Sequence, residues 1–238
     1  MQLSGQLCNC TLSHYGCAML RWMIPLFALA APAIAHAAEA PPPSPGIYTN
    51  EEDVYFTAER GDSAPPWTGV EIAARPDGVQ WRPIDRFAAP LGTWRTDPLL
   101  DGRASITETG ALTLTLADGS ATELRPSRSF TCWMSVKKDV PKADGSEDWD
   151  FVRGLKTHDQ GGRTRAGGGD SGAPEAIIRL RNVIWPAPTT NRPSLVIYVF
   201  RPEDPNRAVS YSWADPDAKR IGINLRWMQA SCTRDGSE

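Results

Sequence analysis

Hydrophobic and polar residues alternate along much of the chain after residue 46, and this period of two predicts β-strands. The clearest case is residues 111–117, in which leucines on one face alternate with threonines on the other. Asp118-Gly119 follows directly, and this dipeptide is typical of the tight turn in a β-hairpin. We therefore expect a hairpin whose return strand covers residues 121–124.

Further short segments bounded by Gly, Pro or Asp also predict strands. They are residues 54–58, 70–73, 79–84 and 130–136, followed in the C-terminal third by 175–185, 194–200, 208–213 and 221–228. The last four are joined by short connections, which predicts an antiparallel meander. Residues 194–200 are apolar on both faces, as in a central strand. Arg179 and Arg181 alternate with apolar residues, as in a strand with one face in water.

Many short strands must close on themselves or pack in two layers to protect their edges. The expected fold class is therefore all-β: an antiparallel sandwich, jelly roll or barrel. Residues 148–156 are expected to form a short helical turn or two. The segment from Lys137 to Gly172 predicts a long loop that is glycine-rich from Gly161 onward. Because loops on rigid strands often carry function, we expect a site there.

The N-terminal region has the features of a signal peptide, with a true start at Met19. Arg21 precedes an apolar run over residues 22–31, and Ala35-His36-Ala37 supplies the small residues that a signal peptidase recognises. The apolar run is too short for a permanent membrane anchor, which needs about 20 apolar residues. We expect residues 1–37 to be removed and the protein to be periplasmic or secreted.

Residues 38–45 are rich in proline and predict an extended spacer, and residues 46–238 are expected to form a single β-rich domain. Cys132 and Cys232 are the cysteines that remain after cleavage. In an oxidising compartment such a pair favours a structural disulfide. The alternative, a redox-active pair, lacks the C-x-x-C spacing that lowers a thiol pKa.

Charge excludes one large class of partner. The chain has 25 Lys plus Arg and 28 Asp plus Glu, and the leader contains only Arg21 among them. The mature protein therefore carries a net charge of about −4, with its charges interspersed. Nucleic acid is not an expected partner, because phosphate binding needs a basic surface. The sequence leaves the oligomeric state open.

Gly169-Asp170-Ser171-Gly172-Ala173-Pro174 resembles the sequence around the nucleophile of chymotrypsin-like serine proteases, over six residues with one difference. In that family the catalytic histidine lies far upstream of the serine. Here the only histidine after the leader is His158, shortly before Ser171. The family's triad has no counterpart in this order, and ordinary turn chemistry explains the motif better.

His158 and Asp159, with Asp148 nearby in an acidic run, are the candidate catalytic residues. A histidine beside a carboxylate suits general base catalysis, but neighbours on an extended chain point in opposite directions. The alternative is a histidine that only braces the loop. A single histidine makes a zinc site unfavourable, and the acidic run lacks the EF-hand pattern, so no metal or cofactor is expected.

Tryptophan is abundant, with nine in the chain. Trp67 and Trp149 lie in loop-like sequence and are candidate ligand-binding platforms, with Arg179 and Arg181 as polar partners. The tryptophans inside strand patterns are assigned to the core, namely Trp133, Trp213 and Trp227.

Two functions follow from this sequence. The first is an exported, non-enzymatic protein that binds a saccharide or another polar small molecule, or that has a structural role in the envelope. The second is a hydrolase or lyase that acts on envelope or extracellular polysaccharide through His158, Asp159 and the acidic run. In either case, a site in the 137–172 loop predicts that His158 faces a cleft lined by a tryptophan and a carboxylate.

Overall fold

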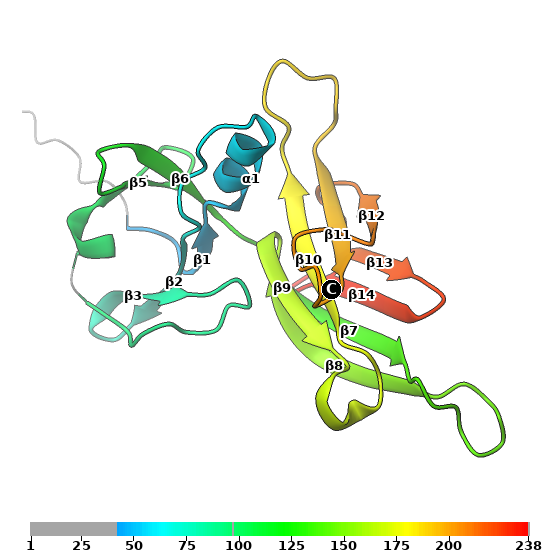
Figure 1. Ribbon diagram of the computed structural model, residues 1–238. Coiled ribbons are helices and arrows are strands. Elements are labelled where there is room, and N and C mark those ends of the chain that lie inside the picture. The colour runs from blue at the N-terminus through cyan, green and yellow to red at the C-terminus, as the bar shows by residue number, and fades with distance from the viewer. Residues whose placement is uncertain (1–41, 97, 238) are drawn as a thin grey trace, which may run out of the picture. The chain divides into compact units, whose positions relative to one another are not determined.

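The protein is built from antiparallel β-sheets, so the predicted all-β class is confirmed (Figure 1). The computed structural model describes residues 42–96 and 98–237. The expected signal peptide therefore lies outside the described residues. Within the described part of the chain, no helix has the length and apolar character needed to span a bilayer.

The N-terminal strands form a curled six-stranded sheet with its own hydrophobic cluster. Its order is β3-β2-β1-β6-β5-β4, with β1 at Gly46–Thr49, β2 at Gly69–Arg75, β3 at Gly78–Ile84, β4 at Ala104–Ile106, β5 at Leu112–Thr115 and β6 at Ala121–Pro126. A 3₁₀ turn at Leu99–Gly102 precedes β4. The predicted hairpin is confirmed: Leu112 pairs with Leu124 across β5 and β6, and both are fully buried.

The C-terminal strands form two four-stranded sheets. One has the order β12-β11-β10-β9, with β9 at Gln160–Ala166, β10 at Ala176–Val183, β11 at Ser194–Phe200 and β12 at Ser210–Ala214. The other has the order β13-β14-β7-β8, with β7 at Ser129–Lys137, β8 at Trp149–His158, β13 at Arg220–Asn224 and β14 at Met228–Arg234. Residues from both sheets share one buried cluster, as in a sandwich.

The predicted long glycine-rich loop is wrong for about half of its length, because β8 and β9 occupy residues 149–158 and 160–166. The connection between β7 and β8 at residues 138–148 lies outside the strands, as predicted. A sharp bend at Asp159 separates the two strands, and the chain passes there from one sheet to the other. Gly161 has φ +79°, and a Cβ at Gly162 would lie 2.6 Å from the backbone of His158. These glycines therefore serve a tight corner between sheets. A short loop with a 3₁₀ turn at Gly169–Ser171 remains.

Two other local predictions are also wrong. Residues 54–58, expected as a strand, lie in helix α1 at Glu51–Glu59. The acidic first turn Glu51-Glu52-Asp53 suits the positive end of the helix dipole. Residues 148–156, expected as a helical turn, lie mostly in β8, which pairs along β7.

The predicted meander is correct only in part. β10, β11 and β12 pair in sequence, with β11 between its neighbours as its apolar character predicted. Residues 221–228 do not form one strand, because the chain turns after Asn224 and Met228 begins β14. The last hairpin belongs to the second sheet of the sandwich.

The predicted bridge between Cys132 and Cys232 is present. The two residues are direct partners in the β7–β14 ladder, with Cα atoms 4.0 Å apart. Both are buried in the shared cluster of the sandwich. The bridge therefore fastens the C-terminal strand to β7 inside the core.

Replacing both cysteines by alanine is expected to lower the free energy of unfolding by about 2–5 kcal/mol, because the bridge closes a loop with a sequence separation of 100 residues. Urea unfolding of the wild type and the double variant measures the difference. Intact mass before and after reduction with alkylation checks the bridge itself. Two alkylatable thiols in the unreduced, denatured protein would contradict it.

Candidate ligand-binding site

One face of the β12-β11-β10-β9 sheet carries aromatic residues on two strands and arginines on the other two. Strand register aligns Tyr211 with Tyr198, Tyr198 with Arg179, and Arg179 with Arg163. Directly opposed residues in antiparallel strands point to the same side of the sheet. One row therefore runs from two tyrosines on β12 and β11 to two arginines on β10 and β9.

A second row repeats the pattern. Trp213 on β12 is aligned with Val196 on β11, and Val196 is aligned with Arg181 on β10. The opposite face of the same strands, including Leu180 and Ile197, packs into the core of the sandwich. The register thus separates an apolar core face from a face with an aromatic half and an arginine half.

The aromatic half is open to solvent and forms a groove with a volume of about 570 Å³. Its lining combines β11 and β12 with the connection between β10 and β11, namely Trp185, Asn191, Arg192, Ser194, Val196, Tyr198, Tyr211 and Trp213. Trp213 is 69% exposed and Tyr211 is 65% exposed. Exposed aromatic residues that gather in a groove are typical of a surface that binds a ligand or a partner protein.

The exposure of Trp213 corrects the prediction that it belongs to the core. It lies in a strand, as expected, but on the outer face of the edge strand β12. The sequence carries a signal for this arrangement, because Tyr211 and Trp213 alternate with Ser210 and Ser212. The aromatic side chains of β12 therefore share a face that the sandwich core does not cover.

The polar lining of the groove has a distinct composition. Arg192 supplies a cation and has no ion-pair partner among the described residues. Asn191 and Ser194 add neutral hydrogen-bonding groups, and the lining contains no aspartate, glutamate or histidine. The groove thus offers aromatic surface, amide and hydroxyl groups and one positive charge, and its lining lacks the carboxylate pair of a typical glycosidase.

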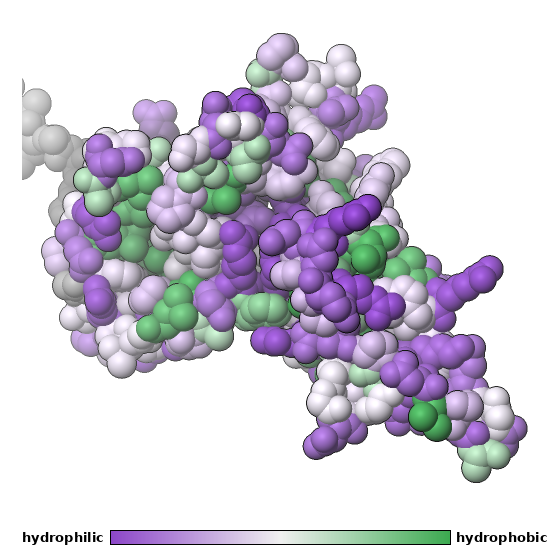
Figure 2. Space-filling model, viewed as in Figure 1, coloured by the Kyte–Doolittle hydropathy of each residue, from purple (hydrophilic) through white to green (hydrophobic). Residues whose placement is uncertain are grey.

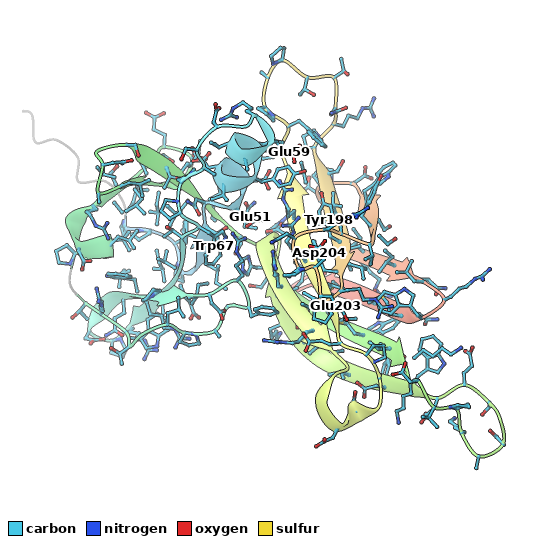
Figure 3. The ribbon with its side chains drawn as sticks, viewed as in Figure 1. Glu51, Glu59, Trp67, Tyr198, Glu203 and Asp204 are labelled. Carbon is cyan, nitrogen blue, oxygen red and sulfur yellow. A yellow bond between two sulfur atoms is a disulfide. The ribbon has the colours of Figure 1, made fainter. Side chains whose placement is uncertain are left out.

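The arginine half is covered by α1, so the predicted wet face of β10 is wrong. The Arg181 side chain has no solvent exposure, and its Nη2 donates to Glu52 Oε1 over 2.8 Å. Arg179, whose side chain is 12% exposed, donates to Glu51 Oε1 over 3.2 Å. Figure 3 shows Glu51 between α1 and the strands β9 and β10, with Tyr198 on β11. These arginines are therefore structural partners of the helix.

Burial and pairing oppose each other in these ion pairs. Burial raises the pKa of the Glu52 carboxyl above its ordinary value, and Arg181 only partly offsets it. Burial also lowers the pKa of Arg179 to about 10, although Glu51 acts in the opposite direction. Each charge is tolerated in the interior because a partner lies within hydrogen-bonding distance.

The first turn of α1 also contacts the N-terminal sheet. Asp53 accepts hydrogen bonds from the Thr122 hydroxyl and the Glu123 backbone amide, both at 2.9 Å. Asn50, just before the helix, accepts a hydrogen bond from the Thr68 amide over 2.7 Å. Consecutive residues of one short segment therefore fasten the helix to both parts of the fold.

Aromatic contacts link the helix to the groove. The guanidinium of Arg181 lies 3.7 Å from the centre of the Tyr55 ring, and Phe56 makes an edge contact with Trp185 at 5.7 Å between ring centres. Arg179 lies 4.9 Å from the centre of the Tyr198 ring. Two residues that line the groove, Tyr198 and Trp185, therefore contact Arg179 of the ion pairs and Phe56 of the helix.

His158 is completely buried, and it is not among the residues that line the aromatic groove. Neither ring nitrogen has a hydrogen-bond partner in the described part of the chain. Burial lowers the pKa of the imidazole to about 4, so it is neutral at physiological pH. This position gives His158 no contact with a ligand in solvent.

Asp159 is buried beside His158 but bonds elsewhere. It accepts hydrogen bonds from the Arg128 backbone amide over 2.8 Å and from Arg128 Nε over 2.5 Å. Burial raises the pKa of its carboxyl above the ordinary value, and the bonds from Arg128 oppose this. The structure therefore places Asp159 in an ion pair that fixes the corner between β8 and β9.

The remaining predicted residues lie apart from one another. Asp148 pairs with Lys138 at 2.9 Å, and the hydrogen bond from Lys138 lowers the pKa of its carboxyl. Trp149 is half-buried at the start of β8. Trp67 is half-buried, and its ring occupies the space above Gly69. None of these residues lines the aromatic groove.

The serine of the protease-like motif is engaged in its own turn. The Ala173 amide donates to Ser171 Oγ over 3.1 Å, as expected for turn chemistry. Among residues 42–96 and 98–237, no group of three or more His, Cys, Asp or Glu residues is arranged to hold a metal ion. The groove on β11 and β12 is therefore the strongest candidate site.

The buried His158 predicts an acid-sensitive fold. The imidazole binds a proton with a pKa near 6.5 when unfolded and about 4 when folded, so the unfolded state takes up more protons between these values. The free energy of unfolding should fall by about 3 kcal/mol from this residue as the pH drops from 7 to 4.

Urea unfolding of wild type and His158→Gln across this pH range measures the effect, because other groups titrate in both proteins. The wild type should lose more stability on acidification than the variant. Identical pH profiles would show that His158 does not titrate as its burial requires.

Comparison with known proteins assigns no family to this chain. No protein-family model, curated protein or solved structure matches it. The groove must therefore be interpreted from its own residues and geometry.

Proposed function

We propose that this chain is an exported, non-enzymatic protein that binds a saccharide in the groove on β11 and β12. The carrying observation is the pair Tyr211 and Trp213, exposed side by side on an edge strand and continued by Tyr198 and Trp185 in one groove. Sugar rings present apolar C–H faces that stack on aromatic rings, and their hydroxyls need polar groups at the rim. Both kinds of group line this groove.

The dimensions of the groove suit this class of ligand. A volume of about 570 Å³ lies within the 300–1,000 Å³ range of small-molecule sites. Asn191, Arg192 and Ser194 supply donors and acceptors next to the aromatic surface. Val196 closes the floor between Tyr198 and Trp213. The ligand thus meets a rigid sheet on one side and a polar connection on the other.

The lining favours binding over hydrolysis. Glycoside hydrolysis needs two carboxyl groups about 5–10 Å apart on either side of the scissile bond, and none lines this groove. The acidic first turn of α1 is engaged elsewhere, with Glu51 and Glu52 bound to arginines and Asp53 to β6. The alternative of a polysaccharide hydrolase therefore has less support than a binding role.

Export is part of the proposal and rests on the N-terminal sequence. The buried disulfide is compatible with an oxidising compartment, where such bridges persist. A periplasmic or secreted saccharide-binding protein combines this bridge with an open aromatic groove.

Isothermal titration calorimetry of the mature protein against neutral and acidic oligosaccharides tests the proposal. Trp213→Ala and Tyr211→Ala should each weaken binding about tenfold or more, because each removes a stacking surface. The melting temperature should change little, since both side chains are mostly exposed. Phe151→Ala is the matched control: it removes an exposed aromatic from β8, outside the groove, and should bind normally.

Absence of binding to every oligosaccharide, or equal loss in Phe151→Ala and Trp213→Ala, would contradict the proposal. Release of shorter or unsaturated products from a polysaccharide would favour the enzymatic alternative instead.

A further inference from the structure

The cluster beneath α1 buries more positive than negative charge. Glu51 Oε2 accepts from Arg86 Nη1 over 2.6 Å, and Glu51 Oε1 accepts from Arg179 Nη1 over 3.2 Å. Arg163 lies in the row next to Arg179 and adds a further guanidinium. Glu52 is already bound by Arg181. Two guanidinium groups therefore bind the single carboxylate of Glu51, and a third, that of Arg163, lies in the same row without an ion pair of its own among the described residues.

Arg163 is the least satisfied member of this cluster. It is about nine-tenths buried, and no carboxylate lies within 4 Å of it in the described part of the chain. Its Nη1 reaches only the Pro205 carbonyl, over a long 3.4 Å, and its Nε has no partner there. The Nε of Arg179 is also buried without a partner among the described residues. A buried cation without a counter-charge is unfavourable, so this arrangement calls for an anion.

Electrostatics agree with the geometry. Burial and the neighbouring Arg86 lower the pKa of Arg163, and Glu51 only partly opposes them. Arg163 and Arg181 likewise act to lower the pKa of Arg179. At Arg163, repulsion from Arg86 therefore outweighs the attraction of Glu51, whereas at Arg179 burial is the largest cause of the lowered pKa.

We propose that Arg86, Arg163 and Arg179 form an oxyanion-binding site under α1, separate from the aromatic groove. The ligand is a small oxyanion: a phosphate, a sulfate or a carboxylate. Guanidinium groups suit these anions because their planar N–H donors match two oxygens at once. The donors available are the Nε groups that lack partners, together with the second edge of Arg86.

The site has a route to solvent. The Arg86 side chain is 31% exposed, whereas Glu51 is almost fully buried. On the face shown in Figure 2, hydrophilic residues gather over β9 and β10, which carry Arg163 and Arg179, and Figure 3 places the acidic residues Glu203 and Asp204 in the same area. Arg179 also contacts the ring of Tyr198, which lines the groove. A free phosphate or sulfate and the carboxylate of an acidic sugar are therefore the sources to distinguish.

Thermal unfolding in sodium phosphate, sodium sulfate and sodium galacturonate tests the site, with sodium chloride at equal ionic strength as the reference. At an anion concentration about 100 times the dissociation constant, the melting temperature of the wild type should rise by roughly 5–10 °C above the chloride value. A response to galacturonate alone identifies a sugar carboxylate as the ligand, and a response to phosphate or sulfate identifies an inorganic oxyanion.

Arg163→Gln should lose most of this rise. Arg153→Gln is the matched control, because Arg153 also lacks a carboxylate partner among the described residues and also lies over a phenylalanine ring, but is exposed on β8. It should respond like the wild type. Arg86→Gln, at the exposed edge of the cluster, should also weaken the rise in melting temperature. If Arg163→Gln does not fold, Arg86→Gln is the variant that tests the anion site.

The proposal is overturned if none of the three anions stabilises the wild type more than chloride does, or if Arg163→Gln and Arg86→Gln keep the full response. The phosphate and sulfate responses, and their loss in Arg163→Gln, do not depend on the aromatic groove. Failure of the wild type to bind saccharides can therefore be separated from failure of this site.

Discussion

The buried ion pairs between α1 and β10 are the interaction on which the arrangement of the fold depends. Arg179 and Arg181 project from a sheet face that would otherwise be wet, and α1 brings Glu51 and Glu52 to meet them. Either partner alone would be an uncompensated charge in the interior, at a cost of several kcal/mol. The helix is short and the residues that it fully buries are Glu51 and Glu52, so its position depends on these carboxylates and on Asp53.

This constraint divides one sheet face into two functional halves. The helix neutralises and covers the arginine half, while Tyr211 and Trp213 at the other edge remain exposed. In the helix, Tyr55 contacts Arg181 and Phe56 contacts Trp185. Because Trp185 lines the groove, the helix also supports the groove. A rigid aromatic surface is useful for stacking, because side chains that are already ordered lose less entropy on binding.

Features determined by local pattern were predictable from the sequence. The β5–β6 hairpin follows from alternating Leu and Thr with a turn dipeptide, and the Cys132–Cys232 bridge follows from the pair of cysteines left in the sequence after the expected signal peptide. Features that depend on residues far apart in the sequence were not predictable in this way. Whether Arg181 faces water or a glutamate depends on a residue with a sequence separation of 129, which no local window contains.

The candidate site shows the same limit. Glycines at 161 and 162 suggested a loop because their other use, a corner where a strand changes sheets, needs tertiary context. His158 was a candidate because it is the only histidine in the sequence from residue 38 to residue 238, yet the corner buries it. Trp213 was assigned to the core because a strand pattern does not reveal which strand lies at an edge. Exposure, and therefore function, was the part that the sequence encoded least directly.

A double-mutant cycle on Glu52 and Arg181, followed by urea unfolding, tests the central claim most directly. Glu52→Gln and Arg181→Met should each lower the free energy of unfolding by about 3–5 kcal/mol, because each leaves a buried charged partner unpaired. The double variant should lose clearly less than the sum of the two, since the charges disappear together. Single losses below about 0.5 kcal/mol, or strict additivity, would show that α1 is not held on β10 by this pair.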